Sequence, residues 1–195
     1  MKKLLYLHDK PEFRNNIFRN SVLFLKNIAK GLIKLDKERL LERLNWFYSL
    51  ELNQVDLYKA QSKAFQKDYT GRVFERLAVI EQGHVDNIGV KIRELGAEPT
   101  RLGDVLAPLL GQLAGKVIGA TKLEEVLKIN TMIEFKAMKD YRKLIEDLKT
   151  GSYGSKDLIR LLQDNYIDEN LHTEWFKTKL SELQTTEFAL DPFLL

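Results

Sequence analysis

A Glu-x-x-His pair occurs twice in this chain, and no other feature of the sequence constrains the fold as strongly. The first pair is Glu81 and His84, and the second is Glu169 and His172. Residues three positions apart lie on one face of an α-helix, so each pair directs a carboxylate and an imidazole the same way. Both pairs also fall on apolar stripes of helical period, which predicts that they point into the core of a helical protein.

Four long segments have the periodicity of amphipathic helices, and they are predicted over 37–67, 72–95, 121–148 and 155–183. The first and third segments each contain one acid in phase with the apolar stripe, Glu51 and Glu134 respectively. We expect turns over 68–71 and 150–154, and we expect Gly96 to end the second helix. The pattern therefore predicts an all-α fold, a four-helix bundle.

Composition limits the chemistry that such a bundle can perform. A chain of 195 residues with 44% hydrophobic residues is long enough for one domain with a sizeable core. The absence of cysteine excludes disulfides, thiolate zinc sites and iron–sulfur clusters, and leaves Glu, Asp and His as the strong metal ligands. A net charge of +3 is too small to indicate a nucleic-acid partner.

The positive charge is concentrated at the N-terminus. Residues 1–34 carry eight basic and two acidic side chains, a net charge of +6 that leaves −3 for the rest of the chain. Residues 13–35 read as a basic amphipathic helix, which either lies on an anionic membrane surface or packs on the bundle.

We divide the chain into this N-terminal segment (1–36), the bundle (37–188) and a tail (189–195). No apolar run reaches the ~18–20 residues of a spanning helix, and no signal peptide is evident.

An apolar segment rich in Gly and Pro, residues 97–120, separates the second and third helices. It is far longer than most connections between bundle helices. We interpret it as a long crossover that covers the bundle core or contacts lipid. The alternative is a packed crossover with one short helix of its own.

Four glutamates directed into one core would repel one another and lose their hydration, which is costly unless cations neutralise them. Two divalent cations balance four carboxylates, and carboxylate oxygen with imidazole nitrogen suits iron, with manganese as the alternative. The predicted ligands are Glu51, Glu81, His84, Glu134, Glu169 and His172. A metal-free bundle with satisfied polar groups is the competing interpretation.

The ligands divide between the two metals by their positions in the helices. Glu51 and His84 are assigned to one metal and Glu134 and His172 to the other, and Glu81 and Glu169 are the candidates to bridge them. Asp168 directly precedes Glu169, and we expect it to accept the free ring N–H of His84 across the bundle.

One Glu from each of two helices with Glu-x-x-His from each of the other two resembles the ferritin-like di-iron carboxylate proteins. Within them, the sequence around the ligands is similar to the demethoxyubiquinone hydroxylase family over about residues 48–176. The motifs that resemble that family are Glu51 with Tyr58 and Gln61, Glu81-x-Gly83-His84, Pro108-Leu109, Gly119-Ala120, and Glu134 with Tyr141. The chain departs from that family at Leu110-Gly111, where the family has Trp, and at Asp140, where it has His.

The resemblance implies a di-iron monooxygenase that activates O2 and hydroxylates a lipophilic, quinone-type substrate with electrons from an external donor. It implies a cytoplasmic protein, peripheral on the inner face of the membrane, and leaves a homodimer open. Tyr58, Tyr141 and Asp168 are the candidates for catalytic roles beside the metal ligands; for the two tyrosines, the alternative is core packing with a satisfied hydroxyl.

A rubrerythrin-like peroxidase and a ferritin-like iron-oxidising protein are the competing functions. The usual rubrerythrin carries a cysteine-ligated electron-transfer domain, which this chain lacks.

Overall fold

The computed structural model describes residues 35–106, 122–151 and 153–189, with side chains described up to residue 185. The chain divides into two units, Met1–Leu35 and Asp36–Leu195, and the following description concerns the second unit. The predicted N-terminal amphipathic helix and most of the predicted crossover lie outside the described residues.

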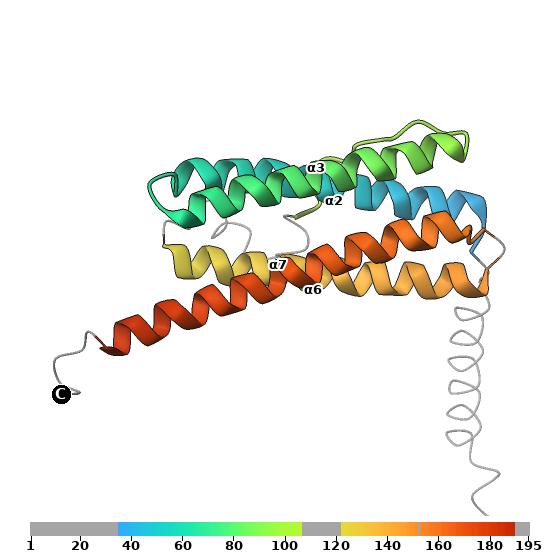
Figure 1. The fold of residues 1–195 in the computed structure, drawn as a ribbon. Helices are drawn as coiled ribbons and strands as arrows, with labels where there is room; N and C mark the ends of the chain where they lie inside the picture. Colours follow the sequence, from blue (N-terminus) through green and yellow to red (C-terminus); the bar gives the residue numbers. More distant parts are fainter. Residues whose placement is uncertain (1–34, 107–121, 152, 190–195) are drawn as a thin grey trace, which may run out of the picture. The chain divides into compact units, whose positions relative to one another are not determined.

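Four helices form the bundle: α2 (Lys37–Ala64), α3 (Tyr69–Glu94), α6 (Leu123–Thr150) and α7 (Lys156–Ala189). α2 and α3 pack together as one antiparallel pair, and α6 and α7 form a second pair that lies alongside the first (Figure 1). The prediction of an all-α four-helix bundle is confirmed. Within the described residues, no helix is both long enough and apolar enough to cross a membrane.

The helix ends follow from local hydrogen bonding. Asp36 caps α2, because its Oδ1 accepts the backbone N–H of Arg39 at 2.9 Å. Ser155 caps α7 in the same way, with its Oγ 3.1 Å from the backbone nitrogen of Leu158. Gly96 has a φ of 76°, a left-handed conformation in which glycine is at no steric disadvantage, and it follows the end of α3 as predicted.

Three predicted boundaries differ from the structure by three residues or more. α2 ends at Ala64 rather than at residue 67, and α7 continues to Ala189, six residues beyond its predicted end. α3 begins at Tyr69, inside the predicted turn, because the side chain of Asp68 accepts the N–H of Thr70 and starts the helix there. The turn is tight, since a Cβ at Gly71 would lie 2.3 Å from the carbonyl oxygen of Phe65.

The segment after α3 is fastened along α2 by a row of side chains. Asn45, Ser49 and Asn53 lie four residues apart, on one face of α2. They accept backbone N–H groups of Thr100 at 2.7 Å, Leu102 at 2.8 Å and Val105 at 2.8 Å, respectively. The chain therefore leaves α3 in a fixed path along α2 before it enters residues 107–121.

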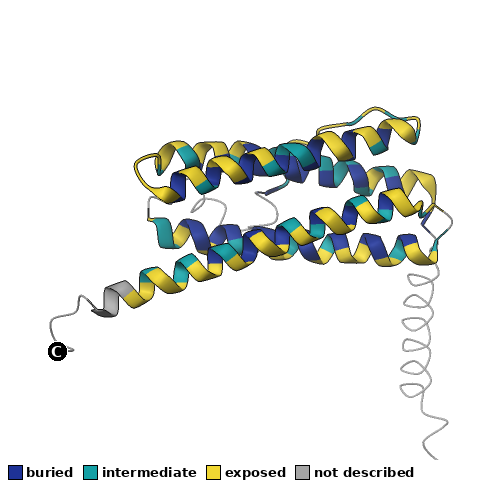
Figure 2. Ribbon diagram, in the orientation of Figure 1, coloured by how far each residue is buried: buried dark blue, intermediate teal, exposed yellow. Residues whose placement is uncertain are grey.

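The core runs along the bundle axis and is mostly apolar, and a buried pair of hydrogen-bonded amides, Gln61 and Asn130, lies toward one end of it. Buried residues lie on the inward faces of all four helices, and exposed residues lie outside (Figure 2). The ring of Phe47 stacks on Tyr141 with centroids 4.0 Å apart, and the ring of Tyr58 lies nearly parallel to Phe74 at 6.2 Å. Four fully buried glutamates interrupt this apolar core, and they define the candidate site.

Candidate metal centre

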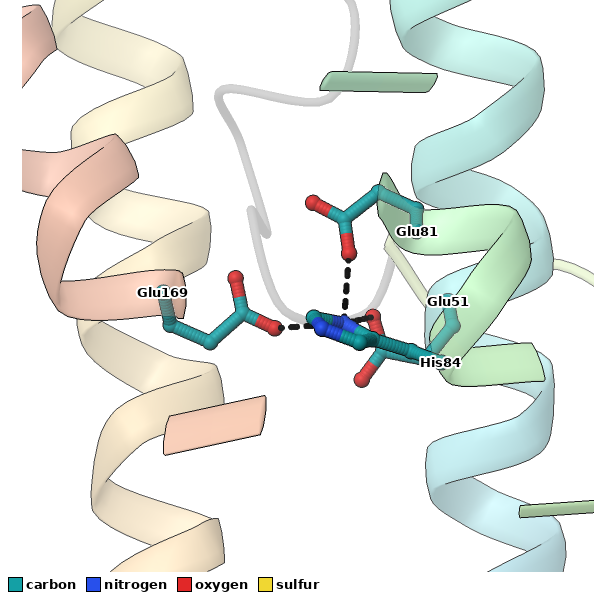
Figure 3. Close-up of side chains that lie close together, drawn as sticks. All are labelled: Glu51, Glu81, His84 and Glu169. Atoms are coloured by element: carbon teal, nitrogen blue, oxygen red, sulfur yellow. Dashed lines mark ion pairs between the residues drawn. The ribbon is translucent and has the colours of Figure 1, made fainter. Parts of the chain in front are cut away.

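All six predicted metal ligands come together in the core of the bundle. Glu51 comes from α2, Glu81 and His84 from α3, Glu134 from α6, and Glu169 and His172 from α7. The four glutamates are 0% exposed, and the two histidines are 3% and 4% exposed. Figure 3 shows Glu51, Glu81 and Glu169 directed toward the ring of His84.

The six residues form two overlapping groups, in each of which the ligand atoms lie within 4.8 Å of one another. We call them the Glu51 group (Glu51, Glu81, His84 and Glu169) and the Glu134 group (Glu81, Glu134, Glu169 and His172). Glu81 and Glu169 belong to both groups. The overlap is the arrangement expected of two cations that share two carboxylates.

The shared carboxylates direct one oxygen to each histidine. Nδ1 of His84 lies 2.9 Å from Oε2 of Glu81 and 3.5 Å from Oε1 of Glu169. Nδ1 of His172 lies 3.2 Å from Oε1 of Glu81 and 3.2 Å from Oε2 of Glu169. Both imidazoles thus turn Nδ1 toward the carboxylates, which leaves Nε2 of each ring facing away.

Two tyrosines reach across the bundle to the carboxylates that belong to only one group each. These are Glu134 and Glu51, which we call the outer carboxylates. The hydroxyl of Tyr58 donates to Oε1 of Glu134, and the hydroxyl of Tyr141 donates to Oε1 of Glu51. Each tyrosine is seven residues past the glutamate of its own helix and binds the glutamate of the other helix. Both hydroxyls are therefore satisfied inside aromatic packing, and both touch a predicted metal ligand.

Asp168 occupies the place expected for it. Its Oδ2 lies 3.1 Å from Nε2 of His84, on the side of the ring opposite the carboxylates. A carboxylate at this position fixes the orientation of the imidazole, and it strengthens the imidazole as a ligand. A catalytic role for Asp168, Tyr58 or Tyr141 stays a prediction.

The ionisable groups of this core have strongly shifted pKa values when no metal is bound. Burial and then the charge of Glu169 raise the pKa of Glu134 to about 8, and the same two causes raise the pKa of Glu51. Burial alone would lower the pKa values of His84 and His172, but the carboxylates around them raise both well above the usual range. Without metal, the raised pKa values favour protons on Glu51, Glu134 and both histidines, and the positive charge of bound cations would replace those protons.

Several buried ligand atoms lie near one another as ion pairs but make no hydrogen bond of acceptable geometry within the described part of the chain. They are Oε2 of Glu51, both carboxylate oxygens of Glu81, Oε1 of Glu169 and Nδ1 of His84. Buried polar atoms are nearly always hydrogen-bonded, so a cluster of unpaired ones is unusual. All of these atoms belong to the groups described above, and a cation bound between them would satisfy them together.

Sequence reasoning missed two buried amides beside the ligands. Nε2 of Gln54 donates to Oε2 of Glu134 at 2.9 Å, and Nδ2 of Asn165 donates to the hydroxyl of Tyr141 at 3.1 Å. The available signal was their phase, since Gln54 is three residues from Glu51 and Asn165 four from Glu169. Tyr166 is half-buried, and its hydroxyl accepts from Arg142 at the surface.

No family model and no curated protein matches the chain. Solved structures do match, among them a bacterioferritin from Desulfovibrio desulfuricans whose diiron site was determined by X-ray crystallography in different catalytic states. That structure has a TM-score of 0.62 and 22% sequence identity, over 76% of this chain and 82% of the bacterioferritin chain. The similarity establishes the fold. This chain is a ferritin-like four-helix bundle, and its two overlapping buried Glu/His groups are consistent with a di-iron site.

Proposed function

We propose that the bundle binds two iron ions, one in the Glu51 group and one in the Glu134 group, and acts as an O2-activating oxidoreductase. The observation that carries the proposal is the overlap of the two groups at Glu81 and Glu169, each with one oxygen toward each histidine. Four carboxylates neutralise two divalent cations, and the mixed oxygen and nitrogen ligands favour iron, with manganese as the alternative.

Two ferrous ions held here would supply electrons for the reduction of O2. The chain supplies a fixed and dry environment for that reaction. Tyr58 and Tyr141 hold the outer carboxylates by hydrogen bonds, and Asp168 holds the ring of His84. The six ligands are at most 4% exposed, and this shielding from bulk water strengthens every charge interaction inside the site.

Within this class, the proposed reaction is hydroxylation of a lipophilic, quinone-type ring. One oxygen atom enters a ring C–H bond and the other leaves as water, with two electrons and two protons from an external donor system. The support is the resemblance of the sequence around Glu51, Glu81 and Glu134 to the demethoxyubiquinone hydroxylase family. Tyr58 and Tyr141 would then have catalytic roles beside the ligands, and Asp168 would position His84.

The same hypothesis proposes that the protein works in the cytoplasm at the inner face of the membrane, where such a substrate dissolves. The basic segment 1–34 would attract it to anionic lipid. Liposome flotation of the full chain and of a chain without residues 1–34 tests this, and equal flotation would reject a role for the segment.

The bacterioferritin-like fold favours a second candidate, an iron-oxidising protein in which ferrous iron is the substrate. A peroxidase of the rubrerythrin kind is a third outcome of the same experiment. The three differ in what the reduced centre consumes, so one set of assays separates them.

The experiment starts from metal-free protein titrated with ferrous iron under anaerobic conditions, and we expect about two ions per chain. The loaded protein is then mixed with O2, with a quinone precursor and reductant, with hydrogen peroxide, or with excess ferrous iron. Transfer of labelled oxygen from O2 to the precursor supports the hydroxylase. Sustained oxidation of excess iron supports the second candidate, and rapid peroxide consumption supports the third. A protein that binds no iron would remove the proposal altogether.

A further inference from the structure

The two halves of the centre are not equivalent, and we propose that the Glu51 group binds its cation more tightly than the Glu134 group and fills first. The inference rests on the metal centre of the proposed function but not on its reaction with O2. Two independent differences carry it, one at the histidines and one at the outer carboxylates.

The histidines differ in what holds the far side of the ring. Nε2 of His84 lies 3.1 Å from Oδ2 of Asp168, whereas Nε2 of His172 is buried and no group in the described ranges accepts from it. The partner of a ligating imidazole fixes its orientation and raises its basicity, and loss of such a partner typically costs 10–100-fold in metal affinity. The imidazole of the Glu51 group is therefore the better oriented and more strongly binding metal ligand.

This difference originates in one position of the sequence. Asp168 directly precedes Glu169 on α7, and it crosses to the histidine of α3, the helix that lies alongside. The residue in the same place before Glu81 on α3 is Ile80, which has no side-chain acceptor for the ring of His172. The two Glu-x-x-His pairs match, but the residues before them do not.

The outer carboxylates differ in how many neutral donors they already accept. Glu134 accepts from Tyr58 on one oxygen and from Gln54, at 2.9 Å, on the other. Glu51 accepts only from Tyr141 among the described residues, and its Oε2 is without a hydrogen bond. Each donor occupies a lone pair and draws negative charge from the oxygen that would bind a cation. Glu51 thus offers the freer carboxylate, in the group that also has the better imidazole.

The direct test is the position of a single cation. Crystals of the full chain carrying one equivalent of Co²⁺ give the occupancy of each position from anomalous scattering. We expect most of the cobalt between Glu51 and His84. Equal occupancy, or a majority between Glu134 and His172, would overturn the inference.

Variants then assign the cause in solution by calorimetric titration with Co²⁺. Asp168→Asn should weaken the tighter step by about 10–100-fold, and Ile80→Asp should strengthen the weaker step. The double variant should move the single cobalt to the Glu134 group. Asp86→Asn is the matched control, because this exposed carboxylate on α3 accepts only from Gln82 in the described structure and should leave both steps unchanged.

Failure of this inference is distinguishable from failure of the proposed function. Two unequal sites with no O2 consumption would reject the function and retain the inference. Two equal sites in a protein that reacts with O2 would do the reverse. If a variant does not fold, as judged by circular dichroism, the wild-type occupancy still decides.

Discussion

At the scale of single residues, the site is organised by donors that cross between helices. Tyr58 and Tyr141 each stand seven residues past one outer glutamate and donate to the other. The crossing ties α2 to α6 through two hydrogen bonds at opposite ends of the ligand cluster. The outer carboxylates are consequently held in place even before a cation arrives.

The two tyrosines should differ in their contribution to stability. Tyr141 donates to Glu51 and also accepts from Asn165, so Tyr141→Phe leaves two buried partners unsatisfied. Tyr58→Phe leaves one, and Glu134 retains the hydrogen bond from Gln54. Because each unsatisfied buried group costs about 1–3 kcal/mol, we expect Tyr141→Phe to lower the free energy of unfolding more than Tyr58→Phe. Urea unfolding of the metal-free variants measures both.

Tyr69→Phe is the control for these substitutions, since that ring is 71% exposed and should change stability little. Equal losses for the two buried tyrosines would show that the bond from Asn165 carries no weight.

The shared carboxylates should differ from the outer ones in metal stoichiometry. Glu81 belongs to both groups, so Glu81→Ala should abolish tight binding of both cations. Glu51 belongs to one group, so Glu51→Ala should leave about one cation per chain, at the Glu134 group. Metal analysis after gel filtration compares the two variants, and a single cation retained by Glu81→Ala would contradict a bridging role.

The sequence predicted the six clustered side chains because each lies on an apolar stripe where a charged or polar residue is out of place. It did not identify Gln54 and Asn165, because amides at helical spacing are common and their partners lie on other helices. The sequence also did not predict that each tyrosine would donate to the glutamate of the other helix. Spacing fixes which face a residue occupies, but not which neighbour it meets across the core.

At the scale of elements, the path of the chain after α3 depends on side chains of α2. The four-residue spacing of Asn45, Ser49 and Asn53 matches the rise of one helical turn, so an extended segment can meet all three. This row explains why residues 97–105 have a defined path without being helical. The sequence did not reveal it, because the acceptors are ordinary polar residues and the donors are backbone groups.

Ser49→Ala should loosen this segment without disturbing the metal ligands. Ser49 is fully buried, and its Oγ accepts the N–H of Leu102 at 2.8 Å, so the substitution leaves a backbone donor without its partner. We expect a loss of about 1–3 kcal/mol in the free energy of unfolding. Hydrogen exchange at Leu102 should accelerate markedly. The matched control, Ser181→Ala, removes an exposed hydroxyl on α7 and should leave both measurements unchanged.

The helix ends show the same division between local and distant information. Gly96 and Ser155 were predicted because positive φ and capping are properties of a residue and its nearest neighbours. The start of α3 was placed too late because Thr70 and Gly71 have turn-like composition, whereas Asp68 caps the helix before them. The further extension of α7 had no boundary signal, because its final residues are compatible with helix.

At the scale of the whole molecule, a charged cluster in the middle of the core couples folding to protons and metal. Without metal, Glu134 has a pKa of about 8, above its ordinary value of 4.5, so the folded protein holds a proton that the unfolded chain releases. Between these two values, each rise in pH therefore favours the unfolded chain. The raised pKa values of His84 and His172 act in the same direction above the ordinary value of 6.5.

We therefore expect the melting temperature of the metal-free protein to fall as pH rises from about 6 to about 8.5. Asp168 and Glu169 do not oppose this trend. The hydrogen bond of His84 lowers the pKa of Asp168, and burial of Glu169 is outweighed by both histidines, which lower its pKa, so the contribution of these two acids is complete at lower pH. With Mn²⁺ present the dependence should reverse. The cation binds ionised carboxylates and neutral imidazoles, so its affinity, and with it the stability of the loaded protein, rises with pH.

Thermal unfolding in chelator and in excess Mn²⁺, at matched pH and ionic strength, should thus give two curves that diverge toward alkaline pH. Glu134→Gln supplies the control, since an amide cannot hold the extra proton, and its chelator curve should be flatter than that of the wild type. Parallel curves would mean that the cation does not replace the protons of this core. The cluster would then be a set of satisfied buried acids, and a metal centre would no longer be needed to explain four glutamates inside one bundle.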